Sequence, residues 1–461
     1  MNIVIFGGTG DLAYRKLYPA LYNLILDSKL PEDIKIFSIG SRKLSKEKFR
    51  ENISESIKRF SRRSSDIKLC ADDIECLEYI RGDISSNELY ELLAKKLDKT
   101  NNIFYLAVKP ELFESISHGL KKCGLNKNAK VIVEKPLGWD LKTAVDINRA
   151  ILSSFQENDI YRIDHYLGKE MTRNIAVLRF ANEIFEPLLC SHFIENIQIS
   201  ICENIGVLDR GRYYDKAGAI RDMLQNHMMQ LLCLATMEMP LSMSPDDIAR
   251  AKISIINDLK IPESNDIIIG QYNGYVNEDG VSPDTLTETY AALKTSINND
   301  RWRGTNIYLR TGKMLSSRYA QVVYEFRKPD KRIFKNADRS NLLALMIQPS
   351  EGVSVKFNLK KPASETEINH VKMNYCQTCI YGTNSPEAYE KLIFDSIEGD
   401  RSSFTSWQEV EASWRYIDEI QKIVKLNRID ILKKYDKGTI GPIEAAALHD
   451  HNKEWIENLN D

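Results

Sequence analysis

The chain has 461 residues, of which 43% are apolar and 28% are charged, and its formal net charge is −2. This composition is typical of a globular protein with a buried core, and a net charge so close to zero argues against a nucleic-acid-binding protein. Because a single core rarely serves so long a chain, we expect two domains, which we place at residues 1–170 and 171–461.

The eight cysteines are dispersed along a chain that is large enough to fold without disulfides, which is typical of reduced thiols in a cytoplasmic protein. Cys376 and Cys379 form a Cys-x-x-Cys motif without a second pair, so we expect ordinary packing there, with a metal or redox role as the alternative. We predict no metal at His449 and His451. No apolar run approaches the ~20 residues that a membrane-spanning helix needs. We therefore predict a cytoplasmic protein without a membrane segment.

Short β-rich runs alternate with helical segments in the first third of the chain. One of these segments, residues 45–63, has apolar residues at three- and four-residue spacing, which indicates an amphipathic surface helix. The alternation predicts a parallel sheet with crossover helices, as in a Rossmann domain. The strands expected there cover residues 3–6, 34–39, 103–108 and 131–134.

The turn after the first expected strand reads Gly7-Gly-Thr-Gly-Asp-Leu-Ala13. It contains the Gly-x-Gly-x-x-Ala form of the dinucleotide fingerprint, in which the glycines let the backbone approach a pyrophosphate and the alanine lets helix pack on strand. The start of the helix adds free N–H groups for the anion. The cofactor-binding residues predicted in this turn are Gly7, Gly8, Thr9, Gly10, Asp11 and Leu12.

The end of the second expected strand carries Ser41 and Arg42. An NAD-selective site usually presents an acidic residue there to the ribose hydroxyls, whereas a hydroxyl and a cation suit a 2′-phosphate. We therefore predict NADP as the cofactor, with NAD as the weaker alternative.

A polar cluster follows the first domain's last helix, in the segment Arg162-Ile-Asp-His-Tyr-Leu-Gly-Lys-Glu170. The acid Asp164, the imidazole of His165, the phenol of Tyr166 and the ammonium of Lys169 stand close together in the sequence. These groups predict a site that binds phosphate and handles protons.

The second domain is expected to combine an antiparallel sheet with long helices. Residues 218–237 read as one long helix, and it carries His227, which is either a catalytic base or a satisfied core histidine. Asp222 and His227 would lie about 140° apart on an α-helix, so we expect Asp164 instead to orient His227. The antiparallel strands are expected at 196–201, 289–295, 305–311, 321–327, 342–348 and 353–359, before a helical region at 386–432.

The motifs together resemble the glucose-6-phosphate dehydrogenase family over almost the whole chain. This resemblance implies oxidation of D-glucose 6-phosphate at C1 to the lactone, with reduction of NADP, in the first step of the oxidative pentose phosphate pathway. It also implies a homodimer or homotetramer that forms through the antiparallel sheet. The motifs that carry it are the glycine-rich turn, Glu134-Lys-Pro-Leu-Gly138, the Arg162–Glu170 segment, Asp222-x-x-Gln-Asn-His227, Leu309-Arg-Thr-Gly-Lys313 and Gly438-Thr-Ile-Gly-Pro442.

The resemblance also implies roles for individual side chains. His227 would be the general base with Asp164 as its partner, and Lys135 would bridge cofactor and substrate. The remaining substrate-binding residues would be His165, Tyr166 and Lys169 around the phosphate, Glu203 and Asp222 on the sugar hydroxyls, and Lys313 and Arg318 from the second domain.

Two other functions compete with this interpretation. Glu-Lys-Pro after a nucleotide-binding sheet also occurs in the glucose–fructose oxidoreductase group, whose members need no phosphate cradle. A nucleotide-sensing regulator with an inactive site is the second alternative, but simple binding would not require a base and an orienting acid.

Overall fold

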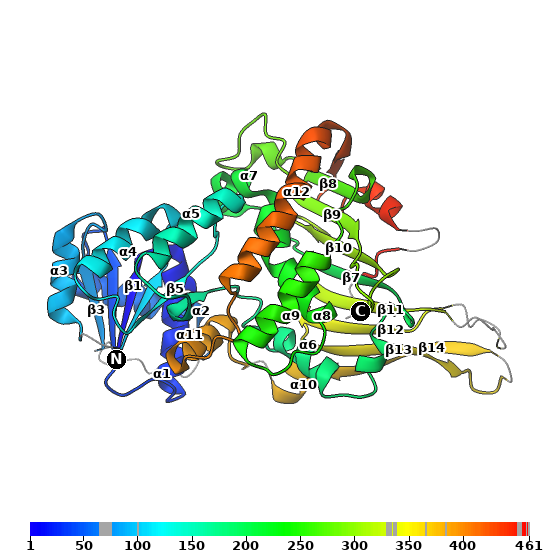
Figure 1. Cartoon of the computed structure of the whole chain (residues 1–461), viewed down its shortest axis with the longest axis horizontal. Helices are drawn as coiled ribbons and strands as arrows, with labels where there is room; N and C mark the ends of the chain where they lie inside the picture. The colour runs from blue at the N-terminus through cyan, green and yellow to red at the C-terminus, as the bar shows by residue number, and fades with distance from the viewer. Residues whose placement is uncertain are drawn as a thin grey trace. The chain divides into compact units, whose positions relative to one another are not determined.

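The computed structural model describes residues 1–63, 76–98, 101–328, 334, 339–364, 367–382, 385–449, 454–457 and 459. Cys70 and His451, which entered the sequence-based predictions, lie outside these residues. The chain divides into two compact units, each of which is described separately below (Figure 1). Among the described residues, no helix has the length and the apolar character needed to cross a membrane.

Unit 1 contains a six-stranded sheet in the order β3-β2-β1-β4-β5-β6, and every pair of neighbouring strands is parallel. This arrangement confirms the predicted Rossmann-like sheet. The order reverses between β1 and β4, and ligands of such sheets bind beyond the carboxyl ends of the strands at that point. The strands are β1 (Asn2–Phe6), β2 (Lys35–Gly40), β3 (Leu77–Arg81), β4 (Asn102–Leu106), β5 (Ala129–Val133) and β6 (Ile160–Arg162).

Helices cover both faces of this sheet, and each face has its own apolar cluster. Ile3 and Ile5 of β1 contribute to one cluster and Val4 and Phe6 to the other, because successive side chains of a strand point to opposite faces. The helices are η1 (Ala13–Leu17, a π-helix), α1 (Tyr18–Leu26), α2 (Lys46–Phe60), α3 (Asn87–Lys96), α4 (Phe113–Lys122) and α5 (Leu141–Leu152).

Two later segments, Ser242–Ala249 and Asn384–Glu411, also belong to unit 1, whose first segment ends at Lys169. A simple division of the chain near residue 170 does not include them. Helix α11 (Ala388–Glu398) joins the unit because Leu392 and Ile393 pack in the same apolar cluster as the sheet. Its Glu390 also forms a buried ion pair with Arg62, at 2.9 Å.

Unit 2 contains a nine-stranded sheet in the order β14-β13-β12-β11-β7-β10-β9-β8-β15. Most neighbours are antiparallel, as predicted, but the pairs β7–β10 and β8–β15 are parallel. The strands are β7 (Ile194–Cys202), β8 (Ile267–Tyr272), β9 (Tyr290–Thr295), β10 (Asn306–Gly312), β11 (Tyr319–Phe326), β12 (Leu342–Gln348), β13 (Gly352–Lys360), β14 (Ile368–Cys376) and β15 (Leu432–Tyr435).

The helices of unit 2 include α6 and α8, which pack against each other beside the sheet (Figure 1). Helices α9 and α12 contribute residues to both units. The α-helices outside the Rossmann region are α6 (Glu170–Phe180), α7 (Gly211–Ala219), α8 (Met229–Thr236), α9 (Pro245–Asp258), α10 (Gln377–Tyr381) and α12 (Trp407–Ile431). The 3₁₀ turns are η4 (Pro110–Leu112), η5 (Glu157–Asp159), η6 (Glu186–Leu188), η7 (Leu208–Arg210), η9 (Ser264–Asp266), η10 (Tyr275–Asn277) and η11 (Ile443–Leu448).

The prediction of one long helix over residues 218–237 is wrong in two respects. Gly218 has φ 67° and ψ 173°, a conformation that is open almost only to glycine, so the chain is kinked at this residue. Residues Ile220–Met228 then form a π-helix, η8, before α8 begins at Met229. In a π-helix the hydrogen bonds join residues five positions apart, so the spacing of side chains differs from that of an α-helix.

The expectation that the cysteines are all reduced is also wrong, because Cys376 and Cys379 form a disulfide. The motif brings the two Cα atoms to 5.3 Å, within the range that a disulfide requires. The free cysteines among the described residues are Cys76, Cys123, Cys190, Cys202 and Cys233.

Candidate functional site

The glycine-rich turn of unit 1 is packed so tightly that side chains are excluded from it. Gly7 has φ +87°, and a Cβ atom there would lie 2.3 Å from the carbonyl oxygen of Ala107. A Cβ on Gly8 would lie 1.8 Å from the Oγ of Ser38. The turn therefore needs glycine at both positions, as the first two glycines of the dinucleotide fingerprint do.

The side chain of Tyr18 holds the glycine-rich turn in place by hydrogen bonds. Its hydroxyl donates to the carbonyl of Gly8 at 2.6 Å and lies 2.5 Å from the Oγ of Ser38. Burial raises the pKa of Tyr18 well above its usual value, so the phenol stays protonated and remains a donor. After β1 the chain thus forms an ordered turn that leads into the π-helix η1. The turn consists of Gly7, Gly8, Thr9, Gly10, Asp11 and Leu12.

Two cations beside this turn form ion pairs. Arg15 lies 3.6 Å from Asp11, and Lys16 lies 2.8 Å from Glu387. All four side chains are substantially exposed, so each pair contributes little to stability. Asp11 is therefore accompanied by a positive charge, which lowers its repulsion toward an incoming phosphate.

The end of β2 presents Ser41 and Arg42, and both residues are exposed. Two side chains of β3 hold their backbone: Tyr79 donates to the carbonyl of Arg42 at 2.6 Å, and Arg81 donates to that of Ser41 at 3.3 Å. Sequence reasoning missed Arg81, because β3 was not predicted as a strand. Arg81 places a second guanidinium at the position where an Arg can accommodate a 2′-phosphate.

The Glu-Lys-Pro motif follows β5 directly. The peptide bond between Lys135 and Pro136 is cis, and Lys135 is half-buried. Tyr105 on the neighbouring strand β4 donates to Glu134 at 2.6 Å. Desolvation raises the pKa of Glu134. Both Glu134 and Lys135 therefore lie just beyond the carboxyl ends of the parallel strands, where such sheets bind ligands.

The polar cluster after β6 is also part of unit 1. Asp164 is buried and accepts a hydrogen bond from the backbone N–H of Tyr166 at 2.9 Å. The ring of His165 lies against that of Tyr166, with 5.0 Å between centroids. The Nζ of Lys169 lies 5.3 Å from the centroid of the Tyr166 ring. The structure thus gathers these four predicted residues into one compact turn.

Unit 2 brings together a second set of predicted residues. The Nζ of Lys313 lies 2.5 Å from the Oε2 of Glu203 and 4.9 Å from the centroid of the Tyr214 ring. Glu203 follows β7 and Lys313 follows β10, and the parallel pairing of these two strands brings their ends together. Arg318 is exposed in the turn before β11.

The π-helix η8 carries both Asp222 and His227, and both are buried. Tyr213 donates to Asp222 at 3.2 Å, and a guanidinium nitrogen of Arg210 lies 4.0 Å from the same carboxylate. These two residues were not predicted; Arg210 lies in η7 and Tyr213 in α7, both before the kink at Gly218. Because i→i+5 hydrogen bonds define this helix, Asp222 and His227 lie about one turn apart, and the separation of about 140° that applies to an α-helix does not hold.

The helix is held in place from its N-terminal end. Gly218 leaves no room for a side chain, because a Cβ there would lie 2.4 Å from the Oε1 of Glu288. Glu288 accepts a hydrogen bond from the N–H of Ile220 at 3.4 Å and forms an ion pair with Arg428 at 3.3 Å. Desolvation raises the pKa of Glu288, and the charge of Arg428 opposes this shift.

Comparison with known protein families gives a match to both parts of the chain. The model described as "Glucose-6-phosphate dehydrogenase, NAD binding domain" matches residues 4–174, and "Glucose-6-phosphate dehydrogenase, C-terminal domain" matches residues 176–456. Among curated proteins, the glucose-6-phosphate 1-dehydrogenase of Bacillus subtilis is 38% identical over 474 residues, which cover 97% of this chain and 96% of the relative. That of Chlamydia pneumoniae is 39% identical over 487 residues, with 98% and 95% covered.

Solved structures show the same likeness. The glucose-6-phosphate 1-dehydrogenase from Mycobacterium avium matches with a TM-score of 0.89 and 31% identity, covering 99% of this chain and 98% of the other. A glucose-6-phosphate dehydrogenase solved in complex with its substrate glucose 6-phosphate matches with the same TM-score, identity and coverage. Both units of this chain, with their motifs in place, therefore identify it as a member of the glucose-6-phosphate dehydrogenase family.

Proposed function

We propose that this protein oxidises D-glucose 6-phosphate at C1 to 6-phospho-D-glucono-1,5-lactone and reduces NADP, as the first step of the oxidative pentose phosphate pathway. The observation that carries this proposal is the similarity over nearly the full chain to glucose-6-phosphate dehydrogenases, one of them solved with glucose 6-phosphate. The residues gathered in each unit supply the functional groups that this reaction requires.

His227 is the proposed general base. Oxidation at C1 removes a proton from the hydroxyl and a hydride from the carbon, and a bound nicotinamide accepts the hydride. An imidazole can take the proton near neutral pH. The π-helix presents His227 from a buried backbone that is anchored at its start by Glu288, so the ring is held by the fold and not by a mobile loop.

Asp164 is the proposed partner of His227. A buried carboxylate beside an imidazole fixes the tautomer of the ring and stabilises the cation that forms when the ring takes a proton. The Oδ1 of Asp164 accepts a hydrogen bond from the backbone N–H of Tyr166, and this bond fixes the orientation of the carboxylate.

The proposed phosphate cradle consists of His165, Tyr166 and Lys169. A phosphate dianion is bound most strongly by charged donors; Lys169 supplies one, and a ring N–H of His165 can donate beside it. The Tyr166 ring packs against both of them, which limits the conformations that they sample. We assign Lys135 to the junction of cofactor and substrate, and Lys313 and Arg318 to the sugar phosphate.

Glu203 and Asp222 are the proposed partners of the sugar hydroxyls, since ionised carboxylates accept hydrogen bonds from them. Each carboxylate already has a positively charged neighbour, Lys313 for Glu203 and Arg210 for Asp222.

NADP is the proposed cofactor. The pyrophosphate would bind at the turn that contains Gly7, Gly8, Thr9, Gly10, Asp11 and Leu12, in which Gly7 and Gly8 leave no room for a Cβ atom. The 2′-phosphate would bind to Ser41 and Arg42, supported by Arg81. Neither Ser41 nor Arg42 is acidic, so neither supplies the carboxylate that usually binds the ribose hydroxyls of NAD.

We further propose that the protein acts in the cytoplasm as a homodimer or homotetramer formed through the nine-stranded sheet. Apolar side chains on and beside its edge strand β14 support this proposal, because Met373, Tyr375 and Ile380 are all exposed. Apolar surface of this kind is common where two proteins meet. Sedimentation of the purified protein would give the number of subunits.

One assay tests the proposed reaction against its alternatives. The absorbance of reduced nicotinamide is followed with glucose 6-phosphate and NADP, then with NAD, and then with unphosphorylated glucose. We expect rapid reduction with the first pair. Comparable efficiency with plain glucose would favour the glucose–fructose oxidoreductase group, and binding of dinucleotide without any reduction would favour a regulator.

Two arginine variants test the cofactor. Arg42→Ala and Arg81→Ala should each raise the KM for NADP roughly tenfold, because each removes a charge-assisted hydrogen bond worth about 1.5–3 kcal/mol. The KM for NAD should hardly change, since NAD lacks the 2′-phosphate. Arg149→Ala, on the exposed face of α5, is the control. Equal effects on NADP and NAD would contradict recognition of the 2′-phosphate by these residues.

A further inference from the structure

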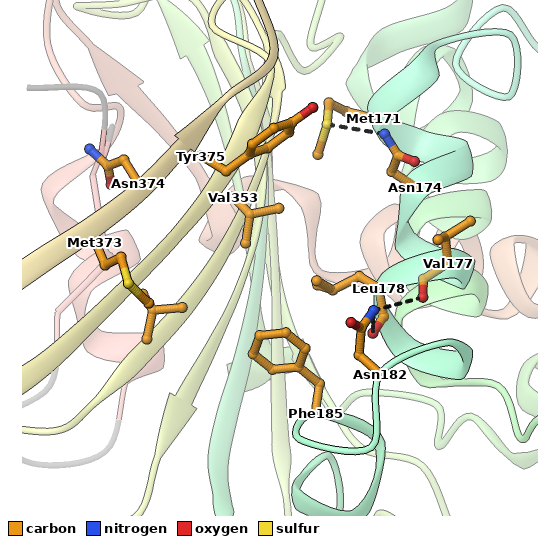
Figure 2. Close-up of a pocket in the computed structure, with 11 residues that line it drawn as sticks. Met171, Asn174, Val177, Leu178, Asn182, Phe185, Val353, Met373, Asn374 and Tyr375 are labelled. Atoms are coloured by element: carbon orange, nitrogen blue, oxygen red, sulfur yellow. Dashed lines mark hydrogen bonds between the residues drawn. The ribbon is translucent and has the colours of Figure 1, made fainter. Parts of the chain in front are cut away.

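The two faces of the nine-stranded sheet have different surroundings. One face lies against α6, and Figure 2 shows Met171 and Leu178 of this helix across a pocket from Val353 of β13. Directly paired residues of neighbouring strands point to the same face, so Ile199 and Leu309 lie on this side of the sheet together with Val353. We call this side the helix-covered face and the opposite side the back face.

The substrate-binding candidates Glu203 and Lys313 belong to the helix-covered face. Side chains alternate along a strand, so Glu203 points to the same side as Ile199, and Lys313 to the same side as Leu309. The N–H of Glu203 donates to the carbonyl of Gly312, the residue before Lys313, at 2.9 Å. The positions of both side chains therefore depend on how the ends of β7 and β10 are held.

The back face of the same strand ends carries a buried cation, Arg310 of β10. Its guanidinium donates to the hydroxyl of Tyr319 at 2.5 Å. Tyr319 begins β11 and is paired with Cys202, which directly precedes Glu203. Because β7 lies between β10 and β11, this hydrogen bond joins β10 to β11 across β7, directly behind the ends that carry Glu203 and Lys313.

A distant segment, residues 454–457, completes this contact. A guanidinium nitrogen of Arg310 lies 2.8 Å from the Oε1 of Glu457, and the hydroxyl of Tyr319 donates to its Oε2 at 2.9 Å. The guanidinium carbon of Arg310 lies 4.6 Å from the centroid of the Trp455 ring. Arg310, Tyr319 and Glu457 therefore form a closed network, in which each residue contacts the other two.

Stability alone does not require this network. Replacing a buried ion pair by apolar side chains often leaves a protein equally stable. The distant segment is also held without the ion pair, because the side chains of Gln198 and Gln321 bind the backbone of Ile456 at 2.8 Å each. A guanidinium adds a fixed geometry that an apolar side chain lacks, since its donors meet their partners in set directions.

We propose that Arg310 is a positioning residue, which together with Tyr319 and Glu457 fixes the strand ends that hold Glu203 and Lys313 for the substrate. The Nζ of Lys313 lies 2.5 Å from the Oε2 of Glu203, so a small shift of either strand end lengthens this contact. Misplaced binding groups lower the efficiency of a reaction even when the change lies far from the chemistry. This role rests on the proposed function, in which both residues bind glucose 6-phosphate.

Two variants separate positioning from stability. Glu457→Gln removes the charge and keeps the shape, and Arg310→Met replaces the cation by an apolar side chain of similar length. We expect each to lower kcat/KM for glucose 6-phosphate roughly tenfold, which is less than the hundredfold that a misplacement of about 1 Å can cost. The KM for NADP and the midpoint of urea unfolding should stay the same. A loss of kcat/KM that only accompanies a lower unfolding midpoint would overturn the positioning role.

Glu195→Gln is the matched control. Glu195 of β7 forms an ion pair at 2.6 Å with Arg327, which directly follows β11, so this pair joins the same two strands at their other ends. Its side chain is 30% exposed and that of Glu457 is 42% exposed, so the two carboxylates are similarly accessible. We expect kcat/KM to be unchanged in Glu195→Gln. Equal losses in Glu195→Gln and Glu457→Gln would contradict a specific role of the network.

The double variant Arg310→Met with Glu457→Gln tests whether the two residues act together. Both changes remove the same contact, so the double variant should lose no more activity than the more strongly affected single variant. Losses that multiply would show two independent effects and would overturn the network.

The parent protein is assayed first, so that the two proposals can fail separately. No reduction of NADP with glucose 6-phosphate by the parent would refute the proposed function. Unchanged kcat/KM in both single variants of an active parent would refute only the positioning role. Sedimentation of each variant gives its number of subunits, and a loss of activity that appears only when this number changes would also overturn the positioning role.

Discussion

The candidate residues of the two units are held by different chemical means. In unit 1 the glycine-rich turn works through its backbone, and the positions of Gly7 and Gly8 leave no room for a Cβ atom. In unit 2 the corresponding groups are the side chains of His227, Glu203 and Lys313, which are held by a π-helix and by strand ends. A site made of backbone leaves a glycine signature in the sequence, whereas a site made of side chains depends on distant elements that align them.

The two units also share a feature. Each contains a π-helix that precedes a regular α-helix: η1 (Ala13–Leu17) after the glycine-rich turn, and η8 (Ile220–Met228) after the kink at Gly218. π-helices are rare and are found frequently at functional sites. In unit 1 the π-helix η1 follows the glycine-rich turn, while in unit 2 the π-helix η8 carries the candidate catalytic and substrate-binding side chains His227 and Asp222.

The role proposed for the side chains of unit 2 is tested most severely by His227→Asn. We expect kcat to fall roughly 10²–10⁴-fold, since that is the usual contribution of a general base, while the KM for glucose 6-phosphate changes little. His118→Asn, on the exposed face of α4, is the control and should keep its activity. A near-normal kcat in His227→Asn would remove this residue from the base role.

The role proposed for the backbone of the glycine-rich turn is tested by Gly8→Ala. The new Cβ would meet the Oγ of Ser38 at 1.8 Å, so the turn must shift at a cost of about 1–3 kcal/mol. We expect dinucleotide affinity, measured by fluorescence titration, to fall about tenfold to a hundredfold. Adding Ser38→Ala removes the atom in closest contact and should restore part of the affinity. Full affinity in Gly8→Ala alone would contradict the close-packed turn.

The kink before η8 is tested by Gly218→Ala. Alanine at φ 67° and ψ 173° should cost about 1–3 kcal/mol of the free energy of unfolding, which chemical denaturation measures. Gly304→Ala is a useful control, because Gly304 also has a positive φ but a Cβ there would meet no atom within 4 Å. We expect the larger loss in Gly218→Ala, because its Cβ would also lie 2.4 Å from the Oε1 of Glu288. Equal losses in the two variants would show that this contact has no energetic effect.

The smallest expected effect concerns the pH dependence of stability. Desolvation raises the pKa of Glu134 from 4.5, so the folded state holds this proton more tightly than the unfolded state does. The contribution of Glu134 is therefore fully present below about 4.5 and is lost as the pH rises through the folded pKa. In Glu134→Gln this loss should disappear. Urea denaturation of both proteins from acidic to neutral pH checks it, and parallel profiles would contradict it.

Much of unit 1 could be predicted from the sequence, because its signals are local. Strand β1 and the turn with Gly8 and Gly10 are neighbours in the chain, and alternating helices and strands restrict the sheet to a parallel arrangement. Strand β3 was missed, since it is short and half-exposed and carries Glu78 and Arg81. Arg81, which holds the backbone of Ser41, was therefore missed as well.

In unit 2 the sequence indicated the sheet and singled out His227, but it gave the wrong helix geometry. Apolar spacing over residues 218–237 fits a continuous α-helix, and nothing local distinguishes i→i+5 from i→i+4 hydrogen bonds. The kink depends on Glu288, which comes from a distant part of the chain. The disulfide was likewise missed, because a Cys-x-x-Cys spacing alone does not reveal whether the two thiols are joined.

The sequence by itself determined the parallel sheet, the mostly antiparallel sheet, the place of the glycine-rich turn and the family, because each follows from short-range periodicity or from a contiguous motif. Only the tertiary structure decided that residues 384–411 complete unit 1, that Arg81 supports the loop of Ser41, and that η8 is a π-helix. These features depend on packing between residues that are far apart in the chain. Packing of that kind leaves no local pattern from which it could be predicted.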